Sequence, residues 1–199
     1  MREDHIGIIG LGYVGLPLAV EFGKKFKTLG FDVNSSRIDE LESGIDITLE
    51  TESSDIESAK KLSFSSDTNA LEDPNIYIVT VPTPIDDSKN PDLSFLESAC
   101  LTIAPYLKAK DIVVFESTVF PGATEEICVP ILEQASGLKF NDNFFCGYSP
   151  ERINPGDKNH KLTTIVKVVS GSTPEIADRL CILYEQIITA GVHRASSIK

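Results

Sequence analysis

Three glycines near the start of the chain have the spacing of a phosphate-binding loop. Gly10, Gly12 and Gly15 form a G-x-G-x-x-G motif that follows an apolar segment and opens a helix-like one. Gly10 would permit a tight turn, Gly12 a close approach of the backbone to a pyrophosphate, and Gly15 close packing of the helix. The amides of Tyr13 and Val14 would then face the pyrophosphate. A glycine-rich structural turn without a ligand is the alternative, and the flanking segments disfavour it.

An acidic residue stands where recognition of a ribose requires one. Asp32 lies 22 residues after Gly10, at the end of a second apolar segment. A carboxylate there accepts from both ribose hydroxyls and repels a 2′-phosphate, so we predict NAD rather than NADP as the cofactor. Arg37 follows, where it would stack on adenine, reach the ribose or pair with a 2′-phosphate. A solvated charge on a helix surface is nearly as well supported for Arg37.

Polar residues also follow two later strand-like segments. Pro82 and Thr83 come after one of them, and Thr83 would offer a hydroxyl to the cofactor. Ser117 and Thr118 come after the other, where Thr118 would hold a nicotinamide or a catalytic water. On composition alone, capping of the next helix by Ser117 and Thr118 is the better supported alternative.

A rigid loop further along the chain carries two neighbouring charges. Glu151 and Arg152 lie in a segment that contains two prolines and a glycine. A carboxylate on rigid backbone can act as a general base or orient a water, and an arginine can bind an anionic or polyhydroxyl substrate. A structural pair of Glu151 and Arg152 on an ordinary loop is the alternative.

Alternating apolar and amphipathic segments predict the elements that position these residues. The expected strands are 6–9, 28–33, 76–81, 112–115, 143–147 and 165–170, and the expected helices are 15–27, 35–43, 94–107, 124–134 and 174–188. This order predicts an α/β fold, a Rossmann-like, doubly wound, mostly parallel sheet with helices on both faces. The polar stretch 44–61 interrupts the pattern, and the proline-rich stretch 82–91 is expected to be a loop.

Composition narrows the class of partner. The 199 residues carry 18 Lys and Arg against 30 Asp and Glu, for a formal net charge of −12. So acidic a chain repels phosphate backbones and anionic lipid, so neither nucleic acid nor a membrane is an expected partner. Because the sequence shows neither a membrane-length apolar stretch nor a signal peptide at its start, we expect a cytoplasmic location.

Four cysteines are scattered along the chain, at Cys100, Cys128, Cys146 and Cys181. None belongs to a C-x-x-C pair, so buried free thiols are favoured over disulfides or a zinc site, and no metal is expected.

Four segments, taken together and in order, carry a family resemblance. They are Gly10–Ala19 (GLGYVGLPLA), Val81–Pro84 (VPTP), Glu116–Gly122 (ESTVFPG) and Ser149–Asp157 (SPERINPGD). They closely resemble the N-terminal domain of the UDP-glucose/GDP-mannose dehydrogenase family of nucleotide-sugar 6-dehydrogenases, over essentially the whole chain. The resemblance implies oxidation of a sugar C6 alcohol to a carboxylate, with two NAD reduced per turnover through an aldehyde and a cysteine thioester.

The same resemblance implies roles for individual residues. The implied NAD contacts are Val14, Asp32, Arg37, Thr83 and Thr118. Thr118 and Glu151 are implied to order the water used in the aldehyde and thioester steps. The residues implied to line the sugar-nucleotide pocket are Glu151, Arg152 and Ile153.

One segment points to a branch of the family. Ser149–Asp157 resembles the branch that acts on UDP-N-acetylhexosamines in Vi-antigen, capsular or O-antigen synthesis. The UDP-glucose branch has a second glutamate where this chain has Pro155. That difference counts against UDP-glucose, and the sugar epimer stays open.

The family's nucleophilic cysteine and its Ala-Lys-x-x-Glu-Asn helix have no counterpart in the sequence. We therefore expect residues 1–199 to be a truncated NAD-binding domain, inactive alone, whose central helix and C-terminal nucleotide-sugar domain are absent. The full-length enzyme is expected to be a homodimer. Two alternatives stay open: the cofactor domain of a 3-hydroxyacid or 6-phosphogluconate-type dehydrogenase, and a non-catalytic dinucleotide-binding module.

Overall fold

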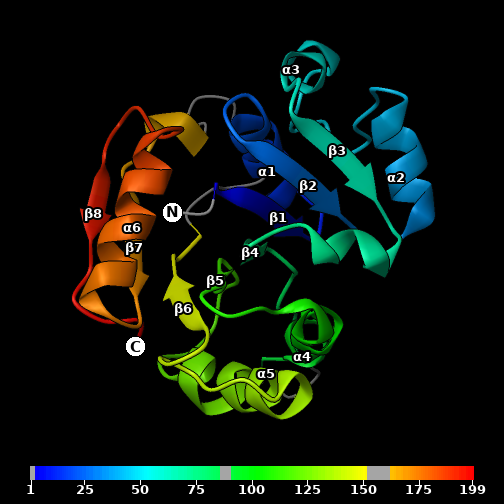
Figure 1. The fold of residues 1–199 in the computed structure, drawn as a ribbon. Helices are drawn as coiled ribbons and strands as arrows, with labels where there is room; N and C mark the ends of the chain where they lie inside the picture. Colours follow the sequence, from blue (N-terminus) through cyan, green and yellow to red (C-terminus); the bar gives the residue numbers. More distant parts are fainter. Residues whose placement is uncertain (1–2, 86–90, 152–161) are drawn as a thin grey trace.

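Within residues 3–85, 91–151 and 162–199, which the computed structural model describes, eight strands form one sheet (Figure 1). The strands are β1 His5–Ile9, β2 Lys27–Phe31, β3 Leu62–Ser65, β4 Ile76–Val79, β5 Ile112–Phe115, β6 Phe145–Tyr148, β7 Lys167–Gly171 and β8 Val192–Arg194. Their order is β3-β2-β1-β4-β5-β6-β7-β8, and each neighbouring pair is parallel except β6 and β7. The predicted mostly parallel, doubly wound sheet is confirmed.

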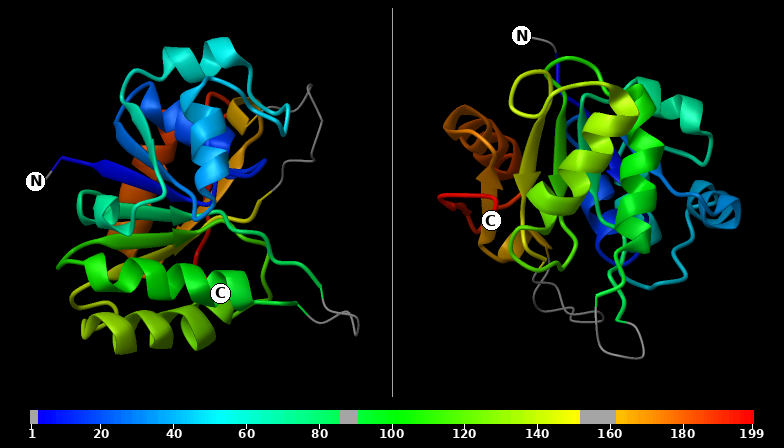
Figure 2. Two further views of the ribbon diagram at one scale, coloured as in Figure 1. Left: turned by 90° about the vertical axis from the view of Figure 1, so that its right-hand side faces the viewer. Right: turned by 90° about the horizontal axis from the view of Figure 1, so that it is seen from below.

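Helices cover both faces of this sheet (Figure 2). They are α1 Gly15–Gly23, α2 Ser35–Glu42, α3 Ser53–Ser58, α4 Ser94–Ile103, α5 Val129–Ser136 and α6 Pro174–Glu185, with a π-helical turn at Thr124–Cys128 before α5. Successive side chains of a strand point to opposite faces. Ile78 and Val114 therefore pack with α1, α2 and α6, whereas Tyr77 and Val113 pack with α4 and α5.

The six predicted strands are all present, with ends shifted by a few residues, but two strands were missed. β3 forms the edge of the sheet and is only half buried, and β8 has three residues, so neither shows the apolar run of a central strand. Within the polar stretch 44–61, the structure places the short helix α3. The expected helix 15–27 ends at Gly23 because Lys27 already begins β2.

The last helix begins as its sequence indicates. The side chain of Thr173 accepts a hydrogen bond from the Ile176 amide, and Pro174 occupies the first turn of α6. Gly191 was expected to stop this helix, but α6 ends at Glu185. Gly191 instead has a φ of 95° just before β8, a conformation that glycine adopts without strain. No helix in the described part of the chain is long and apolar enough to cross a bilayer.

The strand order reverses at the centre of the sheet, and this reversal determines where a ligand can bind. From β1 the chain continues to β2 and β3 on one side, and it then crosses to β4 and β5 on the other side. In open α/β sheets, ligands bind beyond the carboxyl ends of the strands at such a switch point. Gly10, Asp32, Thr80 and Glu116 directly follow β1, β2, β4 and β5, so they meet there.

Candidate functional site

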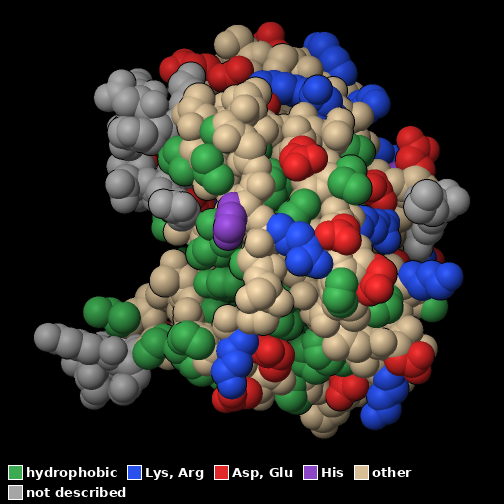
Figure 3. Space-filling view, turned by 90° about the vertical axis from the view of Figure 1, so that its left-hand side faces the viewer, with side chains coloured by type: hydrophobic (Ala, Val, Ile, Leu, Met, Phe, Trp, Pro, Cys, Tyr) green, Lys and Arg blue, Asp and Glu red, His purple; other side chains and the backbone are tan. Residues whose placement is uncertain are grey.

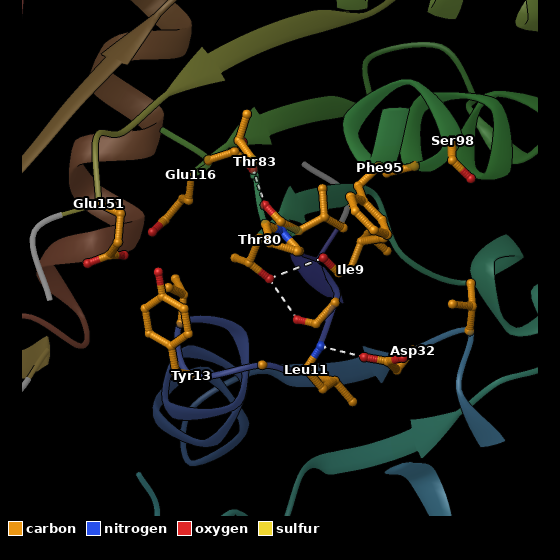
Figure 4. Close-up of a pocket in the computed structure, with 18 of the residues that line it drawn as sticks. Ile9, Leu11, Tyr13, Asp32, Thr80, Thr83, Phe95, Ser98, Glu116 and Glu151 are labelled. Atoms are coloured by element: carbon orange, nitrogen blue, oxygen red, sulfur yellow. Dashed lines mark hydrogen bonds between the residues drawn. The ribbon is translucent and has the colours of Figure 1, made fainter. Parts of the chain in front are cut away.

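A cavity of about 510 Å³ lies at these strand ends (Figure 4). Its volume is in the range of small-molecule and cofactor sites. The predicted site residues that line it are Gly10, Gly12, Tyr13, Val14, Asp32, Pro82, Thr83, Ser117, Thr118 and Glu151. Arg152 and Ile153 lie outside the described residues, so their roles stay predictions. Gly15 and Arg37 lie beside the cavity and not in its wall.

The glycine motif has the geometry that its spacing predicted. Gly10 has a φ of 96°, and its amide donates to the Phe31 carbonyl oxygen at 2.8 Å, which ties the turn to the end of β2. A Cβ atom on Gly15 would lie 1.9 Å from the Gly10 carbonyl oxygen, so only glycine allows α1 to approach this closely. A Cβ atom on Gly12 would meet nothing within 4 Å, because this residue faces open space in the cavity.

A threonine that the sequence analysis overlooked joins this turn to β4. The Thr80 hydroxyl lies 2.7 Å from the Gly10 carbonyl oxygen and 3.1 Å from that of Ile9 (Figure 4). Thr80 was predicted as part of a strand running to residue 81, but β4 ends at Val79. The presence of the polar Thr80 within the apolar run 76–81 was the sequence feature that could have pointed to this contact. Thr80 thus fixes the glycine turn from the neighbouring strand.

Asp32 is held in place by backbone amides. Its Oδ2 atom accepts a hydrogen bond from the Leu11 amide at 2.8 Å, and its Oδ1 atom accepts one from the Asn34 amide at 2.9 Å. A carboxylate has about four acceptor positions, so two such bonds leave capacity for ribose hydroxyls. Figure 4 shows Asp32 pointing toward Leu11 across the floor of the cavity.

The structure contradicts one of the two interpretations of Arg37, the solvated surface charge. Arg37 is buried, and it lies outside the cavity wall. Its Nε donates to the Leu11 carbonyl oxygen at 3.0 Å, and its guanidinium pairs with Asp46 at 2.7 Å. Arg37 thus braces the glycine turn from behind, and its predicted contact with NAD stays untested.

Asp46 in turn organises the loop after α2. Its carboxylate accepts hydrogen bonds from the Thr48 hydroxyl and amide and from the amides of Glu50 and Thr51, in addition to Arg37. Burial opposes ionisation of this carboxyl, but hydrogen bonds from Arg37 and Thr48 outweigh it and lower the pKa of Asp46 below its ordinary value.

The threonines and the serine that follow β4 and β5 face the same cavity. The Thr83 hydroxyl oxygen is buried and has no hydrogen-bond partner among the described residues. Ser117 donates to the Val81 carbonyl oxygen at 2.6 Å, which joins the ends of β4 and β5. Thr118 is exposed to the cavity. The capping alternative is wrong, because the next helix is preceded by Ala123, which provides no side-chain cap.

Glu151 enters the cavity wall beyond the end of β6. Its side chain is 8% exposed, and its Oε2 atom lies 3.6 Å from the Nζ atom of Lys167. In Figure 4, Glu151 and Glu116 lie on one side of the cavity, near the Tyr13 hydroxyl. Any pairing of Glu151 with Arg152 falls outside the described residues. One partner of Glu151 is thus Lys167 of β7, a residue that the sequence did not single out.

Glu116 and Lys167 form a buried ion pair next to Glu151. Lys167 Nζ lies 2.6 Å from Glu116 Oε2, and the Tyr184 hydroxyl donates to Glu116 Oε1. Burial raises the pKa of Glu116 although Lys167 and Tyr184 oppose it. Burial alone would lower the pKa of Lys167, but the carboxylates of Glu116 and Glu151 raise it overall. A charge inside the predicted apolar strand 165–170 was the sequence signal for this pair.

The described cysteines are free thiols, as predicted. Cys100, Cys128 and Cys146 are buried, and Cys181 is half buried in α6. Burial raises the pKa of Cys146, and the neighbouring Cys128 together with burial raises that of Cys100. Protonated buried thiols are poor nucleophiles, which supports their reading as core residues. In the described part of the chain, no group of three or more acidic, histidine or cysteine side chains is placed to hold a metal.

The residues of the cavity fit a dinucleotide. Gly12 leaves open space where a pyrophosphate would approach, and it does so at the positive end of the α1 dipole. Val14 precedes α1 and its apolar side chain makes no capping hydrogen bond, so no side chain competes with a ligand at this helix start. Thr83 has a buried hydroxyl that a ligand could satisfy. The fold and the site together define a dinucleotide-binding domain.

Comparison with known proteins identifies which domain this is. Residues 4–188 match the sequence profile of the UDP-glucose/GDP-mannose dehydrogenase family, NAD binding domain. The chain belongs to this family, and NAD is its cofactor. The match decides against the cofactor domain of a 3-hydroxyacid or 6-phosphogluconate-type dehydrogenase.

Individual relatives agree with this assignment. The chain is 59% identical, over its whole length and 47% of the relative, to UDP-N-acetyl-D-glucosamine 6-dehydrogenase of Pseudomonas aeruginosa. It is 50% identical to protein CapL of Staphylococcus aureus, over 98% of the chain and 46% of that relative. It superposes on UDP-D-ManNAc dehydrogenase of Pyrococcus horikoshii with a TM-score of 0.86 at 29% identity, over 98% of the chain and 47% of that structure. The chain spans about half the length of the curated relatives it matches.

Proposed function

We propose that this chain is the NAD-binding part of a nucleotide-sugar 6-dehydrogenase that oxidises the C6 alcohol of a UDP-N-acetylhexosamine to the uronate, with two NAD per turnover. The observation that carries the proposal is one cavity that joins the glycine turn and Asp32 at one end to Glu151 at the other. A binding module would need only the first of these ends. The acidic residue at the second end supports an enzyme over a non-catalytic module.

The substrate is inferred from the relatives. Two proteins described as UDP-N-acetyl-D-glucosamine 6-dehydrogenase are 59% and 56% identical to this chain. We therefore propose UDP-N-acetylglucosamine as the substrate. The likeness to CapL supports a role in surface polysaccharide synthesis. A cytoplasmic location and a homodimeric full-length enzyme belong to the same proposal.

In this mechanism the chain positions the cofactor and handles protons. Bound NAD supplies the hydride acceptor for the oxidation at C6. Asp32 would accept hydrogen bonds from the adenosine ribose, and the amides of Tyr13 and Val14 would hold the pyrophosphate. Glu151 would accept a proton from the water that, oriented with Thr118, attacks C6 of the thioester and releases the cysteine thiol and the uronate. The nucleophilic cysteine that the family resemblance implies would come from a part of the full-length protein beyond these residues.

Turnover by the full-length protein tests the proposed function. UDP-N-acetylglucosamine, UDP-N-acetylgalactosamine, UDP-N-acetylmannosamine and UDP-glucose are each mixed with NAD, and reduced cofactor is followed by absorbance. We expect UDP-N-acetylglucosamine to give the highest kcat/KM and two reduced cofactors per sugar. Oxidation of none of the four sugars would contradict the proposal, and a clear preference for UDP-glucose would contradict the substrate.

A further inference from the structure

A buried lysine lies between two carboxylates at the end of the cavity where Glu151 stands. Lys167 is the first residue of β7, and its side chain is only 6% exposed. Its Nζ atom lies 2.6 Å from Glu116 Oε2 on one side and 3.6 Å from Glu151 Oε2 on the other. Both carboxylates line the cavity, whereas Lys167 lies behind the wall. One ammonium thus contacts two acidic groups that follow different strands.

The lysine is anchored from the side opposite Glu151. The side chain of Glu116 is completely buried, and its second oxygen accepts the hydrogen bond of the Tyr184 hydroxyl. Tyr184 lies in α6 and is itself fully buried, where its ring packs edge-on against Phe22 of α1. Its position is therefore set by the core. Tyr184, Glu116 and Lys167 form a chain of contacts that leads from α6 to Glu151.

Electrostatics favour a charged lysine in this position. A buried ammonium without partners would lose its proton, but two carboxylates at these distances stabilise the cation. In the described part of the chain, the ionisable groups around the cluster are Glu116 after β5, Tyr148 in β6, Glu151 after β6 and Tyr184 in α6. Lys167 is the cationic member of this set of described residues, and its ammonium attracts the Glu151 carboxylate.

We propose that Lys167 is a positioning residue for Glu151: anchored by Glu116 and Tyr184, its ammonium holds the Glu151 carboxylate at the cavity wall, facing the site of oxidation. Lys167 does not line the cavity, so it acts through Glu151 and not on the substrate. The catalytic meaning of this contact rests on the proposed function. The contact itself can be tested in the 199-residue chain without any substrate.

Titration of the Glu151 carboxyl group tests the contact directly. The glutamate side chains are labelled with 13C at the carboxyl carbon, and the Glu151 signal is assigned by its loss in Glu151→Gln. In Lys167→Met, we expect the Glu151 titration midpoint to move up by about one pH unit, because a cation a few ångströms away is lost. In Lys167→Arg, which keeps the charge, we expect the midpoint to stay close to that of the wild type. An unchanged midpoint in Lys167→Met would overturn the proposal.

Lys167→Met leaves Glu116 buried without its cation, so this variant can fail to fold. The double variant Lys167→Met/Glu116→Gln removes both charges together and keeps a polar partner for Tyr184. We expect it to raise the Glu151 midpoint as well. Glu116→Gln alone is expected to move the Glu151 midpoint down, because the Lys167 ammonium then pairs with a single carboxylate, that of Glu151. A shift of the Glu151 midpoint in the same direction in the double variant and in Glu116→Gln would contradict the positioning role.

Kinetics of the full-length protein test the consequence for catalysis. We expect Lys167→Met to lower kcat at least tenfold, to leave the KM for NAD within twofold, and to move the acidic limb of the pH profile upward. Lys167→Arg is expected to regain part of kcat, whereas a purely structural role would leave the pH profile in place. If the wild-type protein oxidises no nucleotide sugar, the proposed function fails, and the carboxyl titration still decides the role of Lys167.

Discussion

The two ends of the cavity are built in different ways. At the end formed by β1 and β2, which we call the recognition end, the glycine turn and Asp32 come from one short stretch of sequence, and backbone amides hold the Asp32 carboxylate. At the end formed by β5, β6 and β7, which we call the acidic end, Glu116, Glu151 and Lys167 come from separate segments and hold one another by charge.

In the proposed function, the difference follows from what each end has to bind. A pyrophosphate and a ribose can be recognised by backbone amides, a helix dipole and a single carboxylate, and a local motif can encode these. A carboxylate that accepts protons needs a defined orientation inside a low-dielectric site, which requires partners from elsewhere in the fold. Substitutions at the two ends should therefore separate cofactor affinity from turnover.

The largest expected effect comes from the acidic end. We expect Glu151→Gln to lower the kcat of the full-length protein by about 10² to 10⁴-fold, the range for loss of a general base. Steady-state turnover with UDP-N-acetylglucosamine measures this change. Glu97→Gln, at an exposed position of α4, is the matched control and should leave kcat unchanged. Turnover of Glu151→Gln within threefold of the wild type would remove Glu151 from the mechanism.

The free energy of unfolding should depend on the ion pair of Arg37 and Asp46, which supports the glycine turn of the recognition end. Asp46→Asn removes the nearer and fully buried of the two carboxylates that pair with the Arg37 guanidinium and leaves only Glu40, 3.5 Å away, so we expect it to lower the free energy of unfolding by roughly 3 kcal/mol. Urea denaturation of the 199-residue chain at neutral pH measures the loss. Asp39→Asn, an exposed change on α2, is the control.

The same pair predicts a pH dependence. The pKa of Asp46 is lowered by folding, so its ionised form contributes stability above the ordinary pKa of an aspartate. That contribution is lost as the pH falls through the lowered pKa of the folded state. The stability gap between the wild type and Asp46→Asn should therefore narrow below about pH 4. A gap that stays constant into acid would show that charge is not what Asp46 contributes.

Two alanine substitutions in the glycine turn separate folding from binding. Gly15→Ala places a Cβ atom against the Gly10 carbonyl oxygen, so we expect a loss of about 2 kcal/mol and a drop in Tm of about 6 °C. Gly12→Ala places its Cβ atom in open space, so Tm should stay within about 2 °C while NAD binding weakens about tenfold. Thermal unfolding and calorimetry measure the two effects. Similar Tm values for both variants would contradict the packing role of Gly15.

The contrast between the two ends also explains what the sequence could predict. The glycine turn, the central strands and Asp32 follow from local spacing and apolar runs, and each lies where that pattern predicted. The alternative of a surface charge at Arg37 is wrong, because the residue is buried and pairs with Asp46, nine residues away in a polar stretch. Lys167 and Tyr184 were not singled out because their contacts with Glu116 span 51 and 68 residues. No local pattern encodes contacts of that range.

Calorimetric titration of NAD into the 199-residue chain tests the central claim most directly, with the wild type, Asp32→Asn and Glu151→Gln compared. Asp32→Asn keeps an acceptor for the Leu11 amide but removes the charge that we propose holds the ribose. We expect this variant to weaken NAD binding by about tenfold or more, which is the cost of losing a charge-assisted hydrogen bond. We also expect a smaller preference for NAD over NADP. Glu151→Gln should bind NAD within twofold of the wild type. Equal losses in both variants, or no NAD binding by the wild type, would contradict the division of the cavity into a recognition end and an acidic end.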